Sequence, residues 1–171
     1  LHCVVRLAAG VRRLEPAVFG FPGRRGSLLV NARAETADRL PAFRRAFREG
    51  RCLVPADGFY EWSGSPGDRR PVWYHRRAGG ILLLAGLCEP GPDGRLAFVI
   101  LTVDANAAVR EVHDRMPAIL DRGAAERWLA EPDPRLLAPA ADDLLAQQLG
   151  PERAHAEDVG DGVGVPALGE H

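Results

Sequence analysis

Polar and apolar residues follow a strand-like pattern between Cys52 and Trp62, which read Cys-Leu-Val-Pro-Ala-Asp-Gly-Phe-Tyr-Glu-Trp. The pattern predicts an apolar strand, a turn at Asp57-Gly58, and a second short strand of aromatic residues. This second strand carries one carboxylate, Glu61, between two large rings. Rings exclude water from a carboxylate, and such an environment suits it to general acid or base catalysis near neutral pH. The alternative is a strand alternation that points Glu61 into solvent.

Three later apolar runs also predict strands, and short turns separate them. Gly79-Gly80 and the Pro-Gly-Pro-Asp-Gly sequence at 90–94 supply these turns. Strands at regular spacing with tight turns favour an antiparallel sheet or barrel over βαβ units. Further extended segments are expected at 3–6 and 27–30, with turn-rich sequence between them, and at 118–120. The three runs are 71–75, 81–88 and 96–103.

Apolar residues recur at helical spacing after Thr36, at Leu40, Phe43 and Phe47, and predict a buried stripe. Thr36 is suited to the N-cap, the following proline at position 41 to the first turn, and Gly50 to the end of the helix. The opposite face is basic, and is either a solvated surface or a contact for nucleic acid. That face consists of Arg39, Arg44, Arg45 and Arg48.

The last third of the chain predicts three helices and a tail. Asp104 is suited to cap a short helix over 105–110, and a later helix places Trp128 and Leu129 on its inner face. Prolines then interrupt, and an acidic helix is expected up to about Gln148. Residues 150–171 hold little to bury and predict a disordered acidic tail. We therefore expect one α+β domain over residues 1–149, a mostly antiparallel curved sheet or barrel with flanking helices.

Two polar clusters interrupt the apolar pattern. The first, Asn31-Ala-Arg33-Ala-Glu35, places three polar side chains at alternate positions, and therefore on one face of an extended segment. Arg33 suits a phosphate because its planar fork binds oxyanions in two places, and Glu35 is suited to hold that arginine. The second cluster, His113-Asp-Arg-Met-Pro117, places a histidine on a loop, where proton transfer or ligand contact is more probable than packing.

The charge is uneven along the chain. Residues 1–55 hold eleven arginines against four acids, a balance of +7, whereas residues 121–171 hold four arginines against eleven acids, a balance of −7. This asymmetry favours an anionic partner for the N-terminal part. The chain has no lysine, so it offers no side-chain amine for a Schiff base.

Apolar runs are too short to cross a membrane, and we expect a cytoplasmic, nucleoid-associated protein. Three cysteines without paired spacing argue against a disulfide framework or a zinc site, so neither a metal nor a cofactor is expected. Cys52 and Cys88 fall within apolar strands and are interpreted as buried and inert.

The two polar clusters and the Cys52–Trp62 stretch together resemble the SRAP family, the SOS-response-associated peptidases or abasic site processing proteins. The matching blocks are Asn31 to Thr36, Arg51 to Trp62, and Leu101 to Asn106 with His113 to Pro117, and the resemblance covers roughly residues 18–130. It implies binding to single-stranded DNA at abasic sites during the DNA damage response. It also implies a covalent protein–DNA crosslink, a thiazolidine made by the amine and thiol of an N-terminal cysteine.

The resemblance also implies roles for individual residues. Glu61 would assist opening of the sugar ring and proton transfer, Asn31 would position the nucleophile, and His113 would stabilise the opened sugar. Arg33 would hold a phosphate, and Phe19 stands where the family has a tryptophan that lies against DNA. A core aromatic is the alternative interpretation of Phe19.

The chain departs from the family at its start. It opens Leu1-His2-Cys3, without the Met-Cys-Gly-Arg sequence of the family, and its single methionine is Met116. We interpret the sequence as lacking the first residues of the family, and Cys3 as a poor candidate for the nucleophile. If Leu1 is the native terminus, its amine could form a Schiff base but no thiazolidine.

Three interpretations of function remain open at this point. The first is a crosslinking enzyme of lyase or hydrolase type whose nucleophile lies outside these residues. The second is a non-covalent binder of damaged single strands, and the third is an interaction domain that keeps only the fold. A protease is a weaker hypothesis, in which autoproteolysis frees the cysteine, because the sequence contains no serine or thiol dyad for peptide cleavage.

Overall fold

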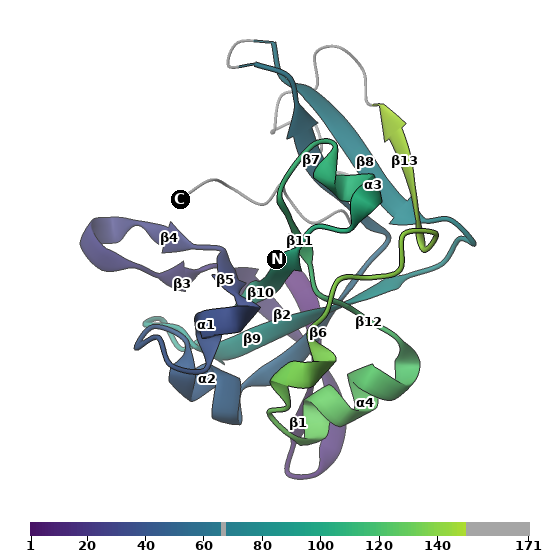
Figure 1. The fold of residues 1–171 in the computed structure, drawn as a ribbon. Helices are drawn as coiled ribbons and strands as arrows, with labels where there is room; N and C mark the ends of the chain where they lie inside the picture. The colour runs from purple at the N-terminus through teal and green to yellow at the C-terminus, as the bar shows by residue number, and fades with distance from the viewer. Residues whose placement is uncertain (66–67, 150–171) are drawn as a thin grey trace.

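The computed structural model describes residues 1–65 and 68–149 of the chain, and its centre is a closed sheet (Figure 1). Five strands pair in the cycle β10–β2–β1–β6–β9 and back to β10. Every pairing in this cycle is antiparallel except that of β10 with β2, which is parallel. The strands are β1 (His2–Ala8), β2 (Val11–Phe19), β6 (Arg51–Ala56), β9 (Leu82–Pro90) and β10 (Leu96–Asp104).

Three short strands extend the closed sheet near the end of β10. β5 (Asn31–Arg33) runs parallel to one edge of β10, and β11 (Arg115–Pro117) runs antiparallel to it. β12 (Ile119–Leu120) then pairs with β9. The C-terminal half of β10 therefore lies between the two polar clusters that the sequence singles out.

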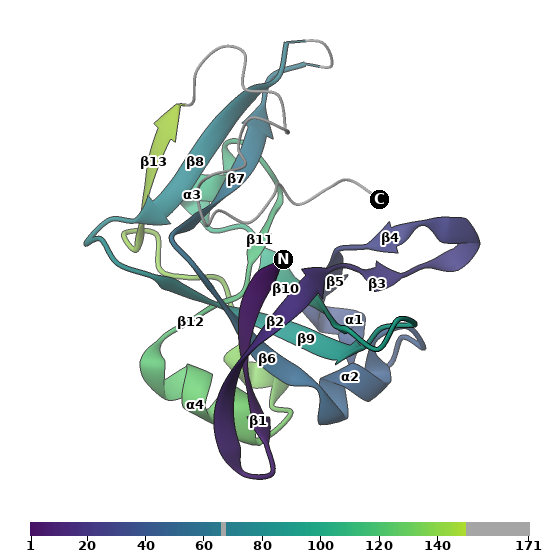
Figure 2. The same ribbon diagram turned by 180° about the vertical axis from the view of Figure 1, so that it is seen from behind.

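Burial of the central strands explains why this sheet closes. Seven successive residues of β10, Ala97–Val103, are buried, which fits a strand covered on both faces. Helices α2 (Arg44–Glu49) and α4 (Arg122–Ala130) pack over β6 and β9 from outside (Figure 2). Trp128 and Leu129 of α4 are buried, as the helical pattern predicts.

Two smaller β elements project from the closed sheet (Figures 1 and 2). One is an arm in which β3 (Phe21–Pro22) pairs with β4 (Leu28–Leu29), with a 3₁₀ turn at Arg24–Gly26 between them. The other is a three-stranded antiparallel sheet in the order β13–β8–β7. Its strands are β7 (Gly58–Ser63), β8 (Arg70–Arg76) and β13 (Leu145–Leu149).

The α+β fold class with a curved, mostly antiparallel sheet is confirmed, and so are the strands of the Cys52–Trp62 block and the three later runs. The expectation for the N-terminus is wrong in part. Residues 11–19 form β2 because their backbone pairs along the whole of β1, through a turn at Ala9-Gly10 in which both residues have positive φ. This strand was hard to recognise in the sequence because it lacks an apolar pattern: four of its first five residues face solvent.

The predicted helix after Thr36 is divided into two short ones. α1 (Ala34–Ala37) contains Thr36, which therefore is no N-cap, and α2 begins only at Arg44. Phe43 and Phe47 are buried as expected, but Leu40 lies in the turn region between the helices and is 42% exposed. Gly50 ends α2 as predicted.

Two further expectations in the last third are wrong. Asp104 does not cap the short helix α3 (Ala107–Arg110), because Asn106 accepts a hydrogen bond from the Val109 amide at the N-cap. The acidic helix is replaced by an irregular segment, including a 3₁₀ turn at Pro134–Leu136, and by strand β13, which pairs with β8. The predicted tail at 150–171 lies outside the described residues. No helix of the described residues is long and apolar enough to cross a membrane.

Arg51 joins the two outer helices to the barrel. Its guanidinium donates to the carbonyl oxygens of Trp128 at 2.8 Å and Phe47 at 3.1 Å, and more weakly to those of Leu129 at 3.5 Å and Ala130 at 3.3 Å. It also donates to the carbonyl of Arg48. These oxygens belong to the last turns of α2 and α4, where carbonyl groups have no N–H donor within their own helix. One cation therefore fixes both helix ends beside β6.

Candidate functional site

The first polar cluster lies beside the end of β10. Asn31, Ala32 and Arg33 pair with Ile100, Leu101 and Thr102. Ala32 is buried, whereas Arg33 is exposed on the opposite face of the strand. The Oδ1 atom of Asn31 is buried and accepts no hydrogen bond from the described residues. Because a buried acceptor without a donor is costly, this atom indicates a place where a ligand group with an N–H or O–H fits.

Arg115 joins the two polar clusters across β10. Its guanidinium donates to Glu35 Oε2 at 2.8 Å, to Asp104 Oδ1 at 2.6 Å and to the Thr102 carbonyl at 2.6 Å. The side chain is only 13% exposed. Its Nε–H is buried and has no acceptor among the described residues. Arg115 therefore holds the clusters together and still has one donor for a further group.

The contacts of Glu35 differ from the expectation. Glu35 lies on α1, not on the extended segment, and its direct partner is Arg115 rather than Arg33. Burial alone would raise the pKa of Glu35, but the hydrogen bond and charge of Arg115, with help from the charge of Arg33, lower that pKa overall. Sequence reasoning assigned no role to Arg115, although its position two residues after His113 was the available signal.

His113 lies on the loop between α3 and β11, and the backbone fixes the orientation of its ring. The amide of Arg115 donates to Nδ1 of His113 at 3.0 Å. The carbonyl oxygen of Arg115 also lies 3.2 Å from Nδ1, but a backbone N–H can only donate, so the shorter contact makes Nδ1 the acceptor and leaves the ring hydrogen on Nε2. The carboxylate of Asp114 lies 3.5 Å from Nδ1. His113 is thus prepared to donate a hydrogen bond through Nε2.

Glu61 is buried, with 1% of its surface exposed, so the solvent-facing alternative is wrong. The rings of Tyr60 and Trp62 are not on its face of β7, because neighbouring residues of a strand alternate. Glu61 instead shares its face with Phe59, which stacks on Tyr74 of β8 at 5.2 Å between ring centroids. The exclusion of water that the sequence predicts is therefore present, but other side chains produce it.

Tyr74 links the Glu61 face to the helix before His113. Burial and the nearby charges of Glu61 and Glu111 raise the pKa of Tyr74 to about 12. Its hydroxyl donates a long hydrogen bond, 3.4 Å, to the carbonyl of Ala108 in α3. This hydrogen bond connects β8 of the three-stranded sheet to α3, which leads into the loop of His113.

Two other sequence candidates lie elsewhere. Phe19 ends β2 and packs against Phe98 with 5.0 Å between ring centroids, so this ring belongs partly to the core, and its contact with DNA stays a prediction. Cys3 is exposed on β1, opposite Pro16. Within residues 1–65 and 68–149, no group of three or more His, Cys, Asp or Glu side chains is arranged to hold a metal ion.

Known proteins resemble this chain in sequence along most of its length. The family model described as SOS response associated peptidase (SRAP) matches residues 8–166. The abasic site processing protein YoqW of Bacillus subtilis is 36% identical over 136 residues, which cover 72% of this chain and 61% of YoqW. The abasic site processing protein YedK of Escherichia coli is 31% identical over 107 residues, which cover 60% of this chain and 48% of YedK. The chain thus spans less than two thirds of the length of these relatives.

Solved structures have the same fold. A protein from Bordetella bronchiseptica superposes with a TM-score of 0.75 and 29% sequence identity, over 88% of this chain and 83% of the other. The family match over residues 8–166 includes both polar clusters. This chain therefore belongs to the SRAP family, as the three sequence blocks predicted.

Proposed function

We propose that this chain binds single-stranded DNA at abasic sites and that the covalent crosslinking chemistry implied by its family resemblance takes place beside Asn31, Glu61 and His113. The observation that carries the proposal is the buried, unpartnered Oδ1 of Asn31, with the unpartnered Nε–H of Arg115 in the adjoining cluster. One is an acceptor and the other a donor, and neither is satisfied by the described residues. A ligand that brings an amine or hydroxyl together with an anionic oxygen would complete both.

The chemistry requires an amine and a thiol on the same residue. The amine of an N-terminal cysteine attacks the aldehyde carbon of the ring-opened sugar, and loss of water gives an imine. The thiol sulfur then adds to the imine carbon, and the nitrogen takes the thiol proton, which closes a thiazolidine ring. In this scheme Asn31 Oδ1 accepts a hydrogen bond from the amine, which orients the lone pair of the amine nitrogen toward the aldehyde carbon.

Proton transfers are assigned to Glu61 and His113. The buried carboxyl group of Glu61 gives and takes the protons of ring opening and water loss, for which exclusion of water is favourable. The Nε2–H of His113 donates to an oxygen of the opened sugar and stabilises the charge that develops there. Both assignments follow from the family resemblance, and the burial of Glu61 and the fixed histidine ring support them.

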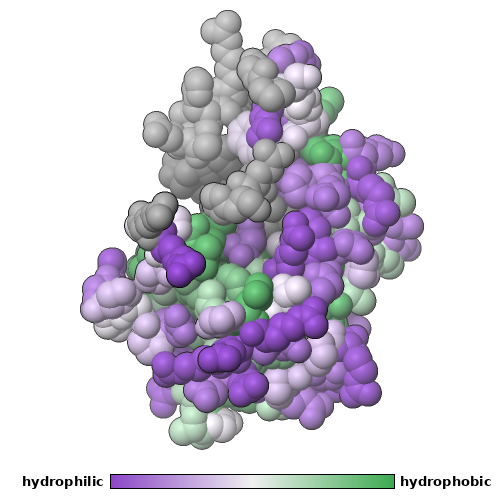
Figure 3. All heavy atoms as spheres, turned by 60° about the vertical axis from the view of Figure 1, so that its left-hand side comes forward, coloured by the Kyte–Doolittle hydropathy of each residue, from purple (hydrophilic) through white to green (hydrophobic). Residues whose placement is uncertain are grey.

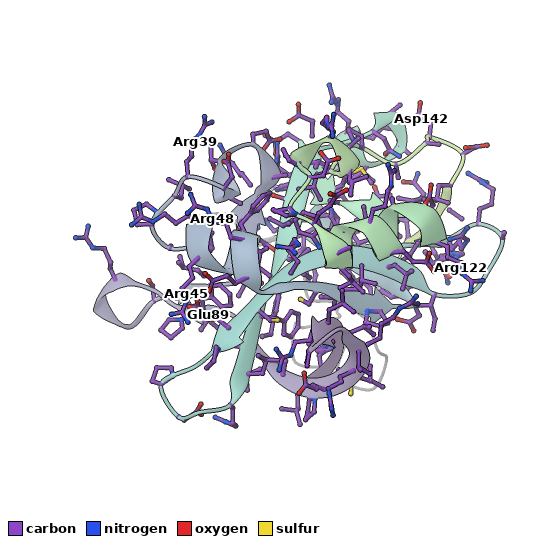
Figure 4. All side chains as sticks on the ribbon, turned by 90° about the horizontal axis from the view of Figure 1, so that it is seen from below. Arg39, Arg45, Arg48, Glu89, Arg122 and Asp142 are labelled. Carbon is purple, nitrogen blue, oxygen red and sulfur yellow. The ribbon has the colours of Figure 1, made fainter. Side chains whose placement is uncertain are left out.

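Exposed arginines supply the expected affinity for the DNA backbone. Arg33 stands at the site itself, and the arginines of α2, with Arg39 in the turn before it, lie on the same side of the molecule as the β3–β4 arm. Hydrophilic side chains cover the lower part of that side (Figure 3). Arg39, Arg45 and Arg48 point outward from it (Figure 4). Binding to DNA through such a surface is expected to weaken with salt, and it would place the protein at the nucleoid.

The test separates recognition from covalent chemistry. The 171-residue chain is mixed with a single strand that carries one abasic site, and its affinity is compared with that for the intact strand. We expect tighter binding to the abasic strand, and a loss of that preference in Asn31→Ala. Arg33→Ala should weaken binding to both strands alike and lower the slope of log K against log salt by about 1. Equal affinity of the unsubstituted chain for both strands would refute the proposal.

Crosslinking is measured on the chain extended by an N-terminal cysteine, with and without borohydride, as a conjugate that survives denaturant. Conjugation without reductant supports the thiazolidine, and a conjugate seen only with borohydride supports a Schiff base that does not close. If the chain prefers abasic strands but forms no conjugate, the crosslinking function is refuted and the chain is a non-covalent binder of damaged strands.

A further inference from the structure

The barrel interior holds two thiols that the proposed DNA chemistry does not use. Cys52 of β6 pairs with Gly86 of β9, and Cys88 lies two residues further along the same face of β9. The two thiols are close enough for each to shift the pKa of the other. Gly86 leaves space for this contact, because a Cβ there would lie 3.0 Å from the sulfur of Cys52. Two neighbouring strands therefore bring the only buried sulfhydryl groups of the described residues together.

An arginine lies over this pair. Arg6 of β1 is directly opposite Cys52 in the β1–β6 register, so its side chain is on the face that carries the thiols. Its guanidinium is also paired with Glu15 of β2. The neighbouring thiol of Cys52, and secondarily the charge of Arg6, lower the pKa of Cys88 against the opposing effects of burial, Glu15 and Glu89, whereas burial raises the pKa of Cys52. The two thiols thus differ, and the thiolate form is favoured more at Cys88 than at Cys52.

Solvent reaches the barrel at this end. A cavity of about 460 Å³ is lined by Arg6 and Glu15, and by Pro90, which follows Cys88 by two residues on the same face of β9. Cys88 is 3% exposed and Cys52 is 0% exposed. Neither cysteine lines the cavity, but Arg6 does, so a molecule of peroxide size that enters it reaches the guanidinium on the thiol face.

We propose that Cys52 and Cys88 form a peroxide-oxidisable dithiol, a modification site inside the barrel that is separate from the DNA site. The thiolate of Cys88 attacks one oxygen of hydrogen peroxide, the O–O bond breaks, and hydroxide leaves, which gives a sulfenic acid. The sulfur of Cys52 then attacks the sulfur of Cys88, the S–O bond breaks, and the departing hydroxide takes the proton of Cys52. Overall two thiols and one peroxide give one disulfide and two molecules of water.

This assignment replaces the interpretation of both cysteines as inert. A disulfide bond is shorter than any non-bonded contact between two sulfur atoms, so β6 and β9 must close slightly around Gly86 when it forms. Because β6 continues directly into β7, the bond would tie the base of the Glu61 strand to β9. Dithiothreitol reverses the step by returning two electrons and two protons.

Trypsin separates the two cysteines, which makes the link easy to detect. Cleavage after arginine leaves Cys52 in peptide 52–69 and Cys88 in peptide 78–95. The chain is studied as the Cys3→Ser variant, so that the exposed third thiol does not react. The folded protein is treated with hydrogen peroxide, its remaining thiols are blocked, and the digest is analysed without reductant. We expect the two peptides to be joined, and to separate after dithiothreitol.

Variants test the order of the steps and the role of the arginine. With Cys52→Ser, Cys88 should stop at a sulfenic acid that dimedone labels, whereas with Cys88→Ser, Cys52 should stay a thiol. Arg6→Gln should slow formation of the disulfide, because the positive charge that favours the thiolate of Cys88 is removed. Arg12→Gln, on the same hairpin but paired with Glu126, is the matched control and should not change the rate.

Two results would overturn the proposal. One is a folded protein in which both peptides remain unlinked and alkylatable after peroxide treatment. The other is a link that forms only in denaturant, because the reaction would then belong to the unfolded chain. Neither result depends on DNA binding, so this inference and the proposed function stand or fall separately.

Discussion

Replacement of Arg51 by methionine gives the sharpest test of the packing between the barrel and its outer helices. The change keeps an unbranched apolar stem of similar length but removes every donor to the carbonyls of α2 and α4. The carbonyls of Trp128 and Phe47 accept two good hydrogen bonds, at 2.8 and 3.1 Å. Their loss leaves two helix ends without a partner at once.

The magnitude follows from these contacts. A hydrogen bond to a charged group contributes about 1.5–3 kcal/mol net, and the two good ones are discounted because the arginine is partly exposed and its desolvation opposes them. Burial lowers the pKa of Arg51, which is the sign of that desolvation cost, and the charge of Glu131 counters it in part. We expect the free energy of unfolding to fall by about 3 kcal/mol, which lowers Tm by about 6–12 °C for a chain of this size.

Urea unfolding followed by tryptophan fluorescence is the assay, because Trp128 packs against Phe47 and donates to the Cys52 carbonyl at 3.2 Å. The midpoint should fall without a change in the slope m. Arg51→Lys is the matched control: it keeps the charge but reaches fewer carbonyls, so it should lose about half as much. A loss below about 1 kcal/mol in the methionine variant would show that water replaces the guanidinium at both helix ends, and would refute the reasoning.

Two further predictions concern pH. Glu35 has a lowered pKa, so its pairing with Arg115 stabilises the folded chain above the pKa of the unfolded state, about 4.3, and this stabilisation is lost as the pH falls through the folded value. Glu35→Gln should therefore flatten the acid limb of a stability–pH curve, and an unchanged limb would contradict the pairing. Tyr74 has a pKa raised to about 12, so its contribution is complete below the unfolded value, about 10, and is lost as the pH rises toward 12. Tyr74→Phe should remove that loss between the two values, as measured by urea unfolding in alkaline buffers; a curve like that of the parent chain would count against the assignment.

Local patterns in the sequence determined much of this fold. The strands on either side of Asp57, the three later strands and the end of α2 at Gly50 were predictable because alternation and glycine act over a few residues. The buried pair Trp128 and Leu129 was predictable for the same reason, from helical spacing. Membership of the family followed from three blocks of residues, because their order and spacing are more specific than any one of them.

Several elements were decided by partners that are distant in sequence. β13 forms because β8 offers a free edge to residues that read locally as a helix, and β2 forms because β1 pairs with it despite its exposed side chains. Asp104, a good cap by its type, turns instead to the guanidinium of Arg115. In each case a tertiary contact outweighs a preference of less than about 1–2 kcal/mol.

The candidate site shows the same division. The sequence singled out the side chains to which we assign the proposed chemistry: Asn31, Glu61 and His113 stand out by residue type and by their apolar surroundings. Only the tertiary structure decided what surrounds them. It buries Glu61 against Phe59 and Tyr74 rather than between Tyr60 and Trp62, and it places Arg115 between the two polar clusters. The side-chain hydrogen bonds of Arg115 join residues 11 to 80 positions apart, and no local pattern records such distances because the chain brings those residues together only when the barrel closes.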